Sequence, residues 1–223
     1  MLTLIGHRGT PSEFTENTVT SLRNAEALGA DGVEFDVRLT RDGVPVLLHD
    51  ADLNRIWGRP DQLADVDFGD VSDILPSLAD VLDAVSIQLV VDCKGSGTVQ
   101  RAIPVLRDGA ALDRSVFIGQ HEVLREVRAE LPDARLALSW AGDSTPPAQV
   151  VEALQPEIMN VRWRDLDPSV LGWYRSVGLT TWWTYTIDDA NALRQAVDLG
   201  FTGLITNDLP GVSAAATKTG VAG

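Results

Sequence analysis

The sequence is short of cysteine, of basic residues and of long apolar runs, and each shortage excludes a class of protein. A single cysteine, Cys93, rules out an intrachain disulfide framework and fits a reducing compartment. With 18 basic residues against 32 acidic ones and a net charge of −14, the chain lacks the basic stripe needed to bind nucleic acid or to dock on anionic lipid. An anionic substrate would need a local cluster of cations, because the overall field repels it.

No segment approaches the roughly 20 consecutive apolar residues that span a bilayer, so stable membrane insertion is not expected. Residues 1–6 have neither the basic start nor the long apolar stretch of a signal peptide. These observations predict a cytoplasmic protein, and the sequence makes no prediction about its oligomeric state. What the sequence does contain is ample core material, because 44% of the residues are hydrophobic.

Strand-like and helix-like segments alternate along the chain, which predicts a parallel sheet with crossover helices. The expected strands span residues 2–6, 32–37, 87–92, 115–118, 135–138, 158–161, 180–184 and 203–205. The expected helices span residues 16–28, 78–84, 99–106, 122–130, 147–154, 169–176 and 189–199. Eight strands within 223 residues suit one α/β domain over residues 1–223, folded as a closed (β/α)8 barrel.

Polar side chains at the ends of many strands favour this barrel over an open doubly wound sheet, which would gather its site at one switch point. Two stretches depart from the alternation. Residues 50–76, rich in Asp and Gly, are predicted to be a short insertion or lid, because long loops in compact barrels are usually functional. Residues 211–223 are predicted to be a C-terminal tail with a short closing helix that then frays.

Three acidic residues are predicted to meet at the mouth of the barrel. Glu34 and Asp36 lie two apart on an apolar strand and share a face, and Asp92 ends the next strand. Buried like charges are costly unless a cation neutralises them, and oxygen ligands suit Mg²⁺ or Ca²⁺. The alternative is that these acids face solvent, as most charged residues do. Lys94 shares a face with Asp92 and could form a plain salt bridge or hold an oxyanion.

Two of the three histidines, His7 and His49, follow apolar segments and flank Glu34 and Asp36 along the chain. Imidazoles titrate near neutral pH, so the pair could act as general acid and base, although a single histidine is more often structural. His121 has no such company and is predicted to be structural. From the residues alone, Thr15 is an acceptable helix N-cap, and Glu16 suits the first helical turn.

Together these motifs resemble the glycerophosphodiester phosphodiesterase family, a group of metal-dependent TIM barrels. The segments that carry the resemblance are His7-Arg8-Gly9, Glu16-Asn17-Thr18, residues 33–43, His49-Asp50, Trp183-Thr184 and residues 200–207. The chain departs from the family pattern at three places. Asp92 stands where the family usually has Glu, Thr15 replaces the usual Pro, and residues 50–76 are shorter than the usual insertion.

The resemblance implies hydrolysis of glycerophosphodiesters to glycerol 3-phosphate and an alcohol, a small-molecule reaction dependent on Mg²⁺ or Ca²⁺. The implied metal ligands are Glu34, Asp36, Asp92 and, in or near the first shell, Glu16. The other implied roles are acid–base catalysis for His7 and His49, phosphate binding for Arg8 and Lys94, and a wall of the substrate pocket for Trp183.

The direction of proton transfer has two versions. In the preferred version His7 activates the attacking hydroxyl and His49 protonates the leaving alcohol, and the reverse is the alternative. Two other functions stay open at this point. One is a lysophospholipase D-like or sphingomyelinase D-like activity on lipids, and the other is a non-catalytic barrel that binds phosphate.

Overall fold

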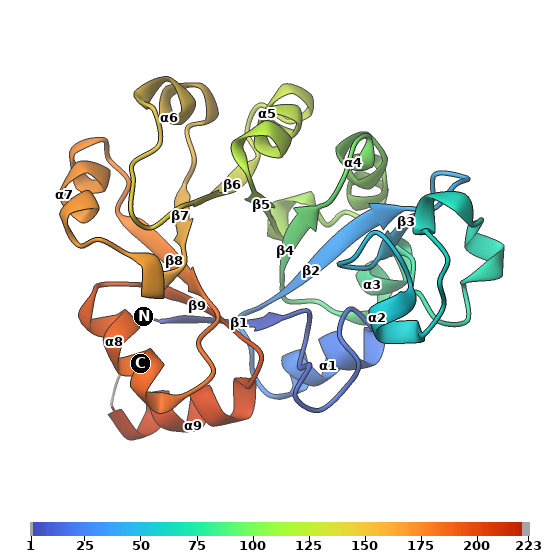
Figure 1. The fold of residues 1–223 in the computed structure, drawn as a ribbon, viewed down its shortest axis with the longest axis horizontal. Coiled ribbons are helices and arrows are strands. Elements are labelled where there is room, and N and C mark those ends of the chain that lie inside the picture. Colours follow the sequence, from blue (N-terminus) through green and yellow to red (C-terminus); the bar gives the residue numbers. More distant parts are fainter. Residues whose placement is uncertain (1, 220–223) are drawn as a thin grey trace.

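The computed structural model describes residues 2–219, and within them eight parallel strands close into the predicted barrel (Figure 1). The first strand closes the barrel because it pairs with both the second strand and the last one. The barrel strands are β1 (Thr3–His7), β2 (Gly32–Leu39), β4 (Gln88–Cys93), β5 (Ser115–Gly119), β6 (Arg135–Trp140), β7 (Ile158–Val161), β8 (Thr181–Tyr185) and β9 (Gly203–Thr206). A short strand, β3 (Pro45–Leu47), pairs antiparallel with the end of β2 and is not part of the closed barrel.

Helices surround the barrel on the outside, as Figure 1 shows. They are α1 (Val19–Ala27), α2 (Asn54–Trp57), α3 (Leu78–Ala84), α4 (Thr98–Asp108), α5 (His121–Glu130), α6 (Ala148–Leu154), α7 (Ser169–Ser176), α8 (Ala190–Asp198) and α9 (Leu209–Thr219). Side-chain caps define where several of them begin. Ser77 and Asp80 form a capping box at the start of α3, and Asp189 accepts hydrogen bonds from two backbone N–H groups at the start of α8.

The core has two layers, one inside the barrel and one between the strands and the helices. The inner layer consists of Ile5, Val90, Val116, Ile118, Ala137, Ile158, Trp183 and Ile205. The strands are covered on both sides, which explains why they are apolar almost throughout. The indole of Trp183 fits because Gly203 lies beside it, where a Cβ atom would come 2.1 Å from the ring.

The first helix begins later than predicted, at Val19 rather than at residue 16. Its N-cap is Thr18, whose side chain accepts from the backbone N–H of Ser21, so the expected cap at Thr15 is wrong. The residues before the helix form a loop in which Asn17 adopts a left-handed conformation, with φ of 56°. This loop reaches the barrel mouth, where Asn17 contacts Asp36.

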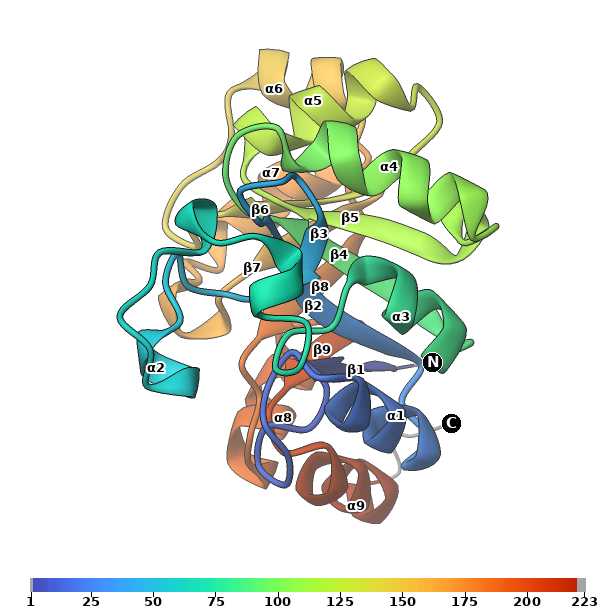
Figure 2. The same ribbon diagram turned by 90° about the vertical axis from the view of Figure 1, so that its right-hand side faces the viewer.

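The insertion over residues 50–76 carries α2 and two short 3₁₀ helices, Leu63–Asp65 and Phe68–Asp70. Figure 2 shows this segment, in cyan, projecting to one side of the barrel. It has a small core of its own, made of Val46, Leu48, Leu53, Leu63, Val71 and Leu75. The insertion is therefore an ordered part of the fold.

Most of the predicted C-terminal tail is helical, since α9 continues to Thr219. Its last residues, 220–223, lie outside the described part of the chain. Within residues 2–219 no helix has both the length and the apolar character that crossing a bilayer requires.

Candidate active site

A cavity of about 450 Å³ opens at the carboxyl ends of the barrel strands. In barrels of this type functional groups gather at that face. Its charged lining consists of His7, Arg8, Glu34, Asp36, Arg38, His49, Asp92 and Lys94. A larger, more open hollow of about 570 Å³ lies beside α1, α2 and α3, but neither the two histidines nor the three acids line it. The chemistry is therefore expected in the barrel mouth.

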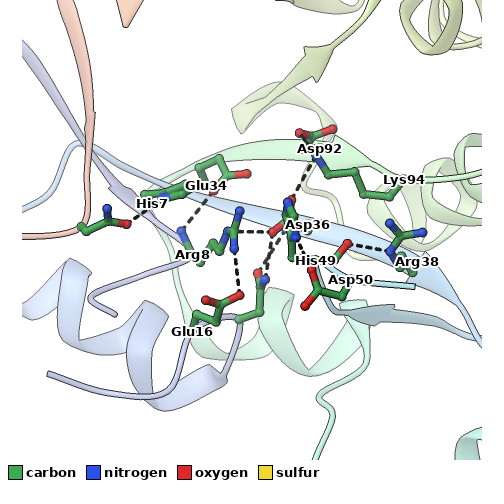
Figure 3. A network of polar contacts seen from close by, with 12 residues as sticks. His7, Arg8, Glu16, Glu34, Asp36, Arg38, His49, Asp50, Asp92 and Lys94 are labelled. Atoms are coloured by element: carbon green, nitrogen blue, oxygen red, sulfur yellow. Dashed lines mark hydrogen bonds and ion pairs between the residues drawn. The ribbon is translucent and has the colours of Figure 1, made fainter. Parts of the chain in front are cut away.

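The three predicted acids meet in this cavity, as Figure 3 shows. Asp36 and Asp92 are direct register partners on β2 and β4. One carboxylate oxygen from each of Glu34, Asp36 and Asp92 lies within 4.8 Å of the others. Glu34 is 4% exposed and Asp36 is 1% exposed. The alternative, in which these acids face solvent, is therefore wrong for Glu34 and Asp36.

Burial and mutual repulsion disfavour the charged forms of these acids. Burial, followed by the charges of Asp36 and Asp92, raises the pKa of Glu34 well above its ordinary value. Burial, with a contribution from Asp36, raises the pKa of Asp92 to about 6. Such a group of crowded carboxylates is the environment that a divalent cation would stabilise.

Two cations partly offset this negative charge. The Lys94 ammonium lies 2.5 Å from Asp92 and 3.3 Å from Asp36. The Arg8 Nε atom lies 3.0 Å from Asp36, although it is not aligned to form a hydrogen bond there. Burial lowers the pKa of Lys94, but the charges of Asp92 and Asp36 outweigh it and raise that pKa overall.

Glu16, which the resemblance placed in or near the metal site, lies outside this group of three acids. Its carboxylate accepts hydrogen bonds from Arg8 at 2.8 Å and from Arg55 at 2.7 and 2.9 Å. The next residue, Asn17, contacts the acids directly. Its amide donates to Asp36 at 2.9 Å, and its oxygen accepts the backbone N–H of Asp36 at 3.1 Å.

Asn207 determines which nitrogen of His7 carries the proton. The Asn207 amide nitrogen donates to Asp188 at 2.9 Å, so its oxygen is turned toward Nδ1 of His7, at 2.7 Å. An amide oxygen only accepts, so Nδ1 carries the hydrogen and Nε2 is left free as a base. That Nε2 atom lies 3.8 Å from Glu34. Burial and the Arg8 charge lower the pKa of His7, which keeps it neutral.

His49 is oriented by a carboxylate. Its Nδ1 atom lies 2.7 Å from Asp50, and the other oxygen of Asp50 accepts from Arg55 at 2.5 Å. The Arg55 bond and the His49 bond hold the pKa of Asp50 below its ordinary value, although its partial burial opposes them. An ionised carboxylate only accepts, so Nδ1 of His49 carries a hydrogen and Nε2 is available for proton transfer. In Figure 3, Glu34 lies beside His7, and the His49 ring overlaps Asp36 in this view.

Trp183, expected to be a wall of the substrate pocket, lies instead in the inner core of the barrel. Tyr185, two residues further along β8, lines the cavity in its place. Besides Asn17 and Tyr185, the sequence analysis missed Arg38 and Arg55. Arg38 follows Asp36 by two residues, so the alternation that paired Glu34 with Asp36 would have placed it on the same face.

The acids fit a divalent cation. Three oxygen donors converge, two of them on almost fully buried side chains, and hard cations such as Mg²⁺ and Ca²⁺ prefer such ligands. Burial and the charges of Asp36 and Asp92 outweigh Arg8 and Lys94 and raise the pKa of Glu34, so a further cation nearby would stabilise its charged form. Glu34, Asp36 and Asp92 are therefore the residues that could hold a metal.

Comparison with known proteins finds the family that the sequence motifs resemble. The model of the glycerophosphoryl diester phosphodiesterase family matches residues 7–210. A glycerophosphodiester phosphodiesterase of Caldanaerobacter subterraneus subsp. tengcongensis is 22% identical, covering 92% of this chain and 93% of that protein. Rat glycerophosphodiester phosphodiesterase 1 is 41% identical over 73 residues, which are 33% of this chain and 22% of that protein.

Solved structures show the same fold. A phosphodiesterase of Oleispira antarctica, solved in complex with the product sn-glycerol-3-phosphate, superposes with a TM-score of 0.89 at 20% identity, covering 96% of each chain. A glycerophosphodiester phosphodiesterase of Thermotoga maritima superposes with a TM-score of 0.79 at 24% identity, covering 94% of this chain and 96% of that one.

Proposed function

The chain belongs to the glycerophosphoryl diester phosphodiesterase family, and from that premise we propose that it hydrolyses glycerophosphodiesters with the help of a divalent cation. The products would be glycerol 3-phosphate and an alcohol. The observation that carries the proposal is the meeting of three carboxylates, two of them almost fully buried, and two oriented histidines in one cavity. A product complex with glycerol 3-phosphate in the Oleispira relative supports the same substrate class.

Glu34, Asp36 and Asp92 would hold the cation. When bound, the cation would offset negative charge on the phosphoryl oxygens. Arg8 and Lys94 line the same cavity and add positive charge for binding the phosphate group.

His7 and His49 divide the proton transfers according to where they lie. The side chain of His7 is 20% exposed and close to Glu34, so it takes the proton from the attacking hydroxyl, of water or of the glycerol itself. The side chain of His49 is 39% exposed, so it protonates the alcohol that leaves toward solvent. Each ring is held by its Nδ1 atom, which leaves Nε2 for the transfer.

The test is a screen of glycerophosphodiesters and lysolipids in the presence of Mg²⁺ or Ca²⁺, with glycerol phosphate and free alcohol as readouts. We expect release of glycerol phosphate, with a fall of about 10²-fold or more in kcat for His49→Ala, the cost of losing a general acid. Release of alcohol from lysolipids alone would favour the lipid phosphodiesterase alternative. Phosphate binding without turnover would favour the non-catalytic barrel and end the proposal. The choice between Mg²⁺ and Ca²⁺ and a cytoplasmic location stay predictions from the sequence.

A further inference from the structure

Arg38 is a cation in the catalytic cavity that lies near several carboxylates but, among the described residues, forms an ion pair with none of them. Three other cations close to the site are each paired: Arg8 with Glu16 and Asp36, Lys94 with Asp36 and Asp92, and Arg55 with Glu16 and Asp50. Among residues 2–219, Arg38 forms no ion pair with any acidic side chain. The charges of Asp36, Asp50 and Asp92 act on Arg38 only from a distance, so its half-buried guanidinium has no direct anionic partner. A half-buried charge without such a partner is costly.

The position of Arg38 on β2 places it next to the reacting groups. It shares the inward face of the strand with Glu34 and Asp36 and lies two residues beyond Asp36, which is about 7 Å further toward the mouth. The pairing of Arg38 with Val46 on β3 holds its backbone. In Figure 3 its side chain lies beside His49 and Asp50.

The guanidinium is anchored at one nitrogen and open at the other two. Its Nε atom donates to the backbone carbonyl of His49 at 2.8 Å. The Nη1 side faces Gly95, whose positive φ of 85° lets the loop turn past the guanidinium without a side chain over it. Four N–H groups on Nη1 and Nη2 therefore have no side-chain acceptor among the described residues.

We infer that Arg38 is a phosphate-binding residue of this site, which reaches the phosphoryl oxygens from the mouth side of the three acids. A planar guanidinium with two free nitrogens matches two oxygens of a phosphate group. Its anchor on His49 keeps it in a constant position relative to that catalytic histidine. The inference rests on the proposed function, because it assigns Arg38 to the phosphate group of the same substrate.

The experiment compares Arg38→Met and Arg38→Lys with Arg194→Met, which makes the same change in net charge as Arg38→Met, at an exposed residue of α8. Two constants are measured on the metal-loaded enzyme: KM for glycerophosphoglycerol and the dissociation constant of inorganic phosphate, the latter by calorimetry. For Arg38→Met we expect both to rise about 10- to 100-fold, the cost of losing a charge-assisted contact. Arg38→Lys should lie between Arg38→Met and wild type, and Arg194→Met should match wild type.

Unchanged values of both constants in a folded Arg38→Met protein would overturn the inference, and thermal unfolding checks folding. If Arg38→Met does not fold, Arg38→Lys decides the question in the same way. Glycerophosphoserine separates phosphate recognition from recognition of an anionic alcohol. If Arg38→Met raised KM for glycerophosphoserine alone and left the dissociation constant of phosphate unchanged, Arg38 would bind the carboxylate of the alcohol and not the phosphate. That result would overturn the inference. Because phosphate titration needs no turnover, an inactive wild type would refute the proposed function and still leave Arg38 tested.

Discussion

Glu34→Gln should stabilise the protein in the absence of divalent metal, although it removes a residue of the candidate metal site. The Glu34 side chain is 5% exposed, and its 3.8 Å neighbour is Nε2 of the neutral His7. Among the described residues, Glu34 forms no ion pair with a lysine or arginine. One oxygen accepts the backbone N–H of Arg8 at 3.1 Å, a bond that the amide oxygen of Gln can keep. The substitution therefore removes a charge with little change in shape.

The sign of the effect follows from the pKa of Glu34, which burial, Asp36 and Asp92 raise well above its ordinary value of 4.5. A carboxyl group with a higher pKa in the folded state loses stability as the pH rises through its unfolded value, and the loss is complete above the folded value. Gln does not titrate. The advantage of the variant should therefore be small near pH 5 and larger at pH 8.

The expected magnitude is about 1–3 kcal/mol at pH 8, within the range for replacing a buried charge by a neutral side chain. For a chain of this length that corresponds to a rise in Tm on the order of 5 °C. With metal at about 100 times its Kd, the wild type should gain about 2.7 kcal/mol, whereas the variant should gain much less. In the presence of metal the wild type should therefore be as stable as Glu34→Gln or more stable.

The assay is thermal unfolding followed by circular dichroism at pH 5 and pH 8, first with a chelator and then with Mg²⁺ or Ca²⁺. Glu152→Gln, at an exposed residue of α6, makes the same change in net charge and is the control. A Glu34→Gln protein that is less stable than the wild type at pH 8 in chelator would refute the reasoning. So would a stability difference that is the same at both pH values.

Three further substitutions test how the site is supported. Asn207→Leu should lower kcat, measured by steady-state kinetics, because Nδ1 of His7 loses the acceptor that fixes its proton. The expected fall is about 10- to 100-fold, the usual cost of removing the hydrogen-bond partner that orients a functional imidazole. Arg55→Met should speed amide hydrogen exchange in the insertion, because it removes the ion pairs of Arg55 with Glu16 and Asp50. Mass spectrometry measures this exchange. Gly203→Ala should destabilise the fold by about 1–3 kcal/mol in denaturant unfolding, because its Cβ would overlap an indole ring 2.1 Å away.

The fold was predictable because each signal was local. Parallel strands buried on both faces read as short apolar runs, and the helices between them read as amphipathic segments. The meeting of Glu34 with Asp36 also followed from the alternation of side chains along one strand. The barrel then brought Asp92 beside them, since β4 is the neighbour of β2. All three steps need only the periodicity of a strand and the order of strands around a barrel.

The contacts that sequence reasoning missed depend on distant parts of the chain. Glu16 is bound by Arg55, which is 39 residues away in the insertion, and no periodicity links the two. The sequence also did not predict how deep a residue lies inside the barrel, because that depth depends on the stagger between strands. Trp183 was placed at the mouth for that reason, whereas its indole lies one layer deeper and Tyr185 lines the cavity.

Whether Asp92 can replace the usual Glu as a metal ligand depends on where the fold places its carboxylate. The family usually has Glu at this position, and Asp is one methylene shorter. In this chain Asp92 is level with Asp36 in the register of the two strands, and one of its oxygens still lies within 4.8 Å of those of Glu34 and Asp36. The Lys94 ammonium contacts both aspartates, so it and a divalent cation are alternative partners for the same oxygens. A divalent cation bound to these oxygens would weaken the attraction between Asp92 and Lys94. The Lys94 ammonium would then be available to bind a phosphate group.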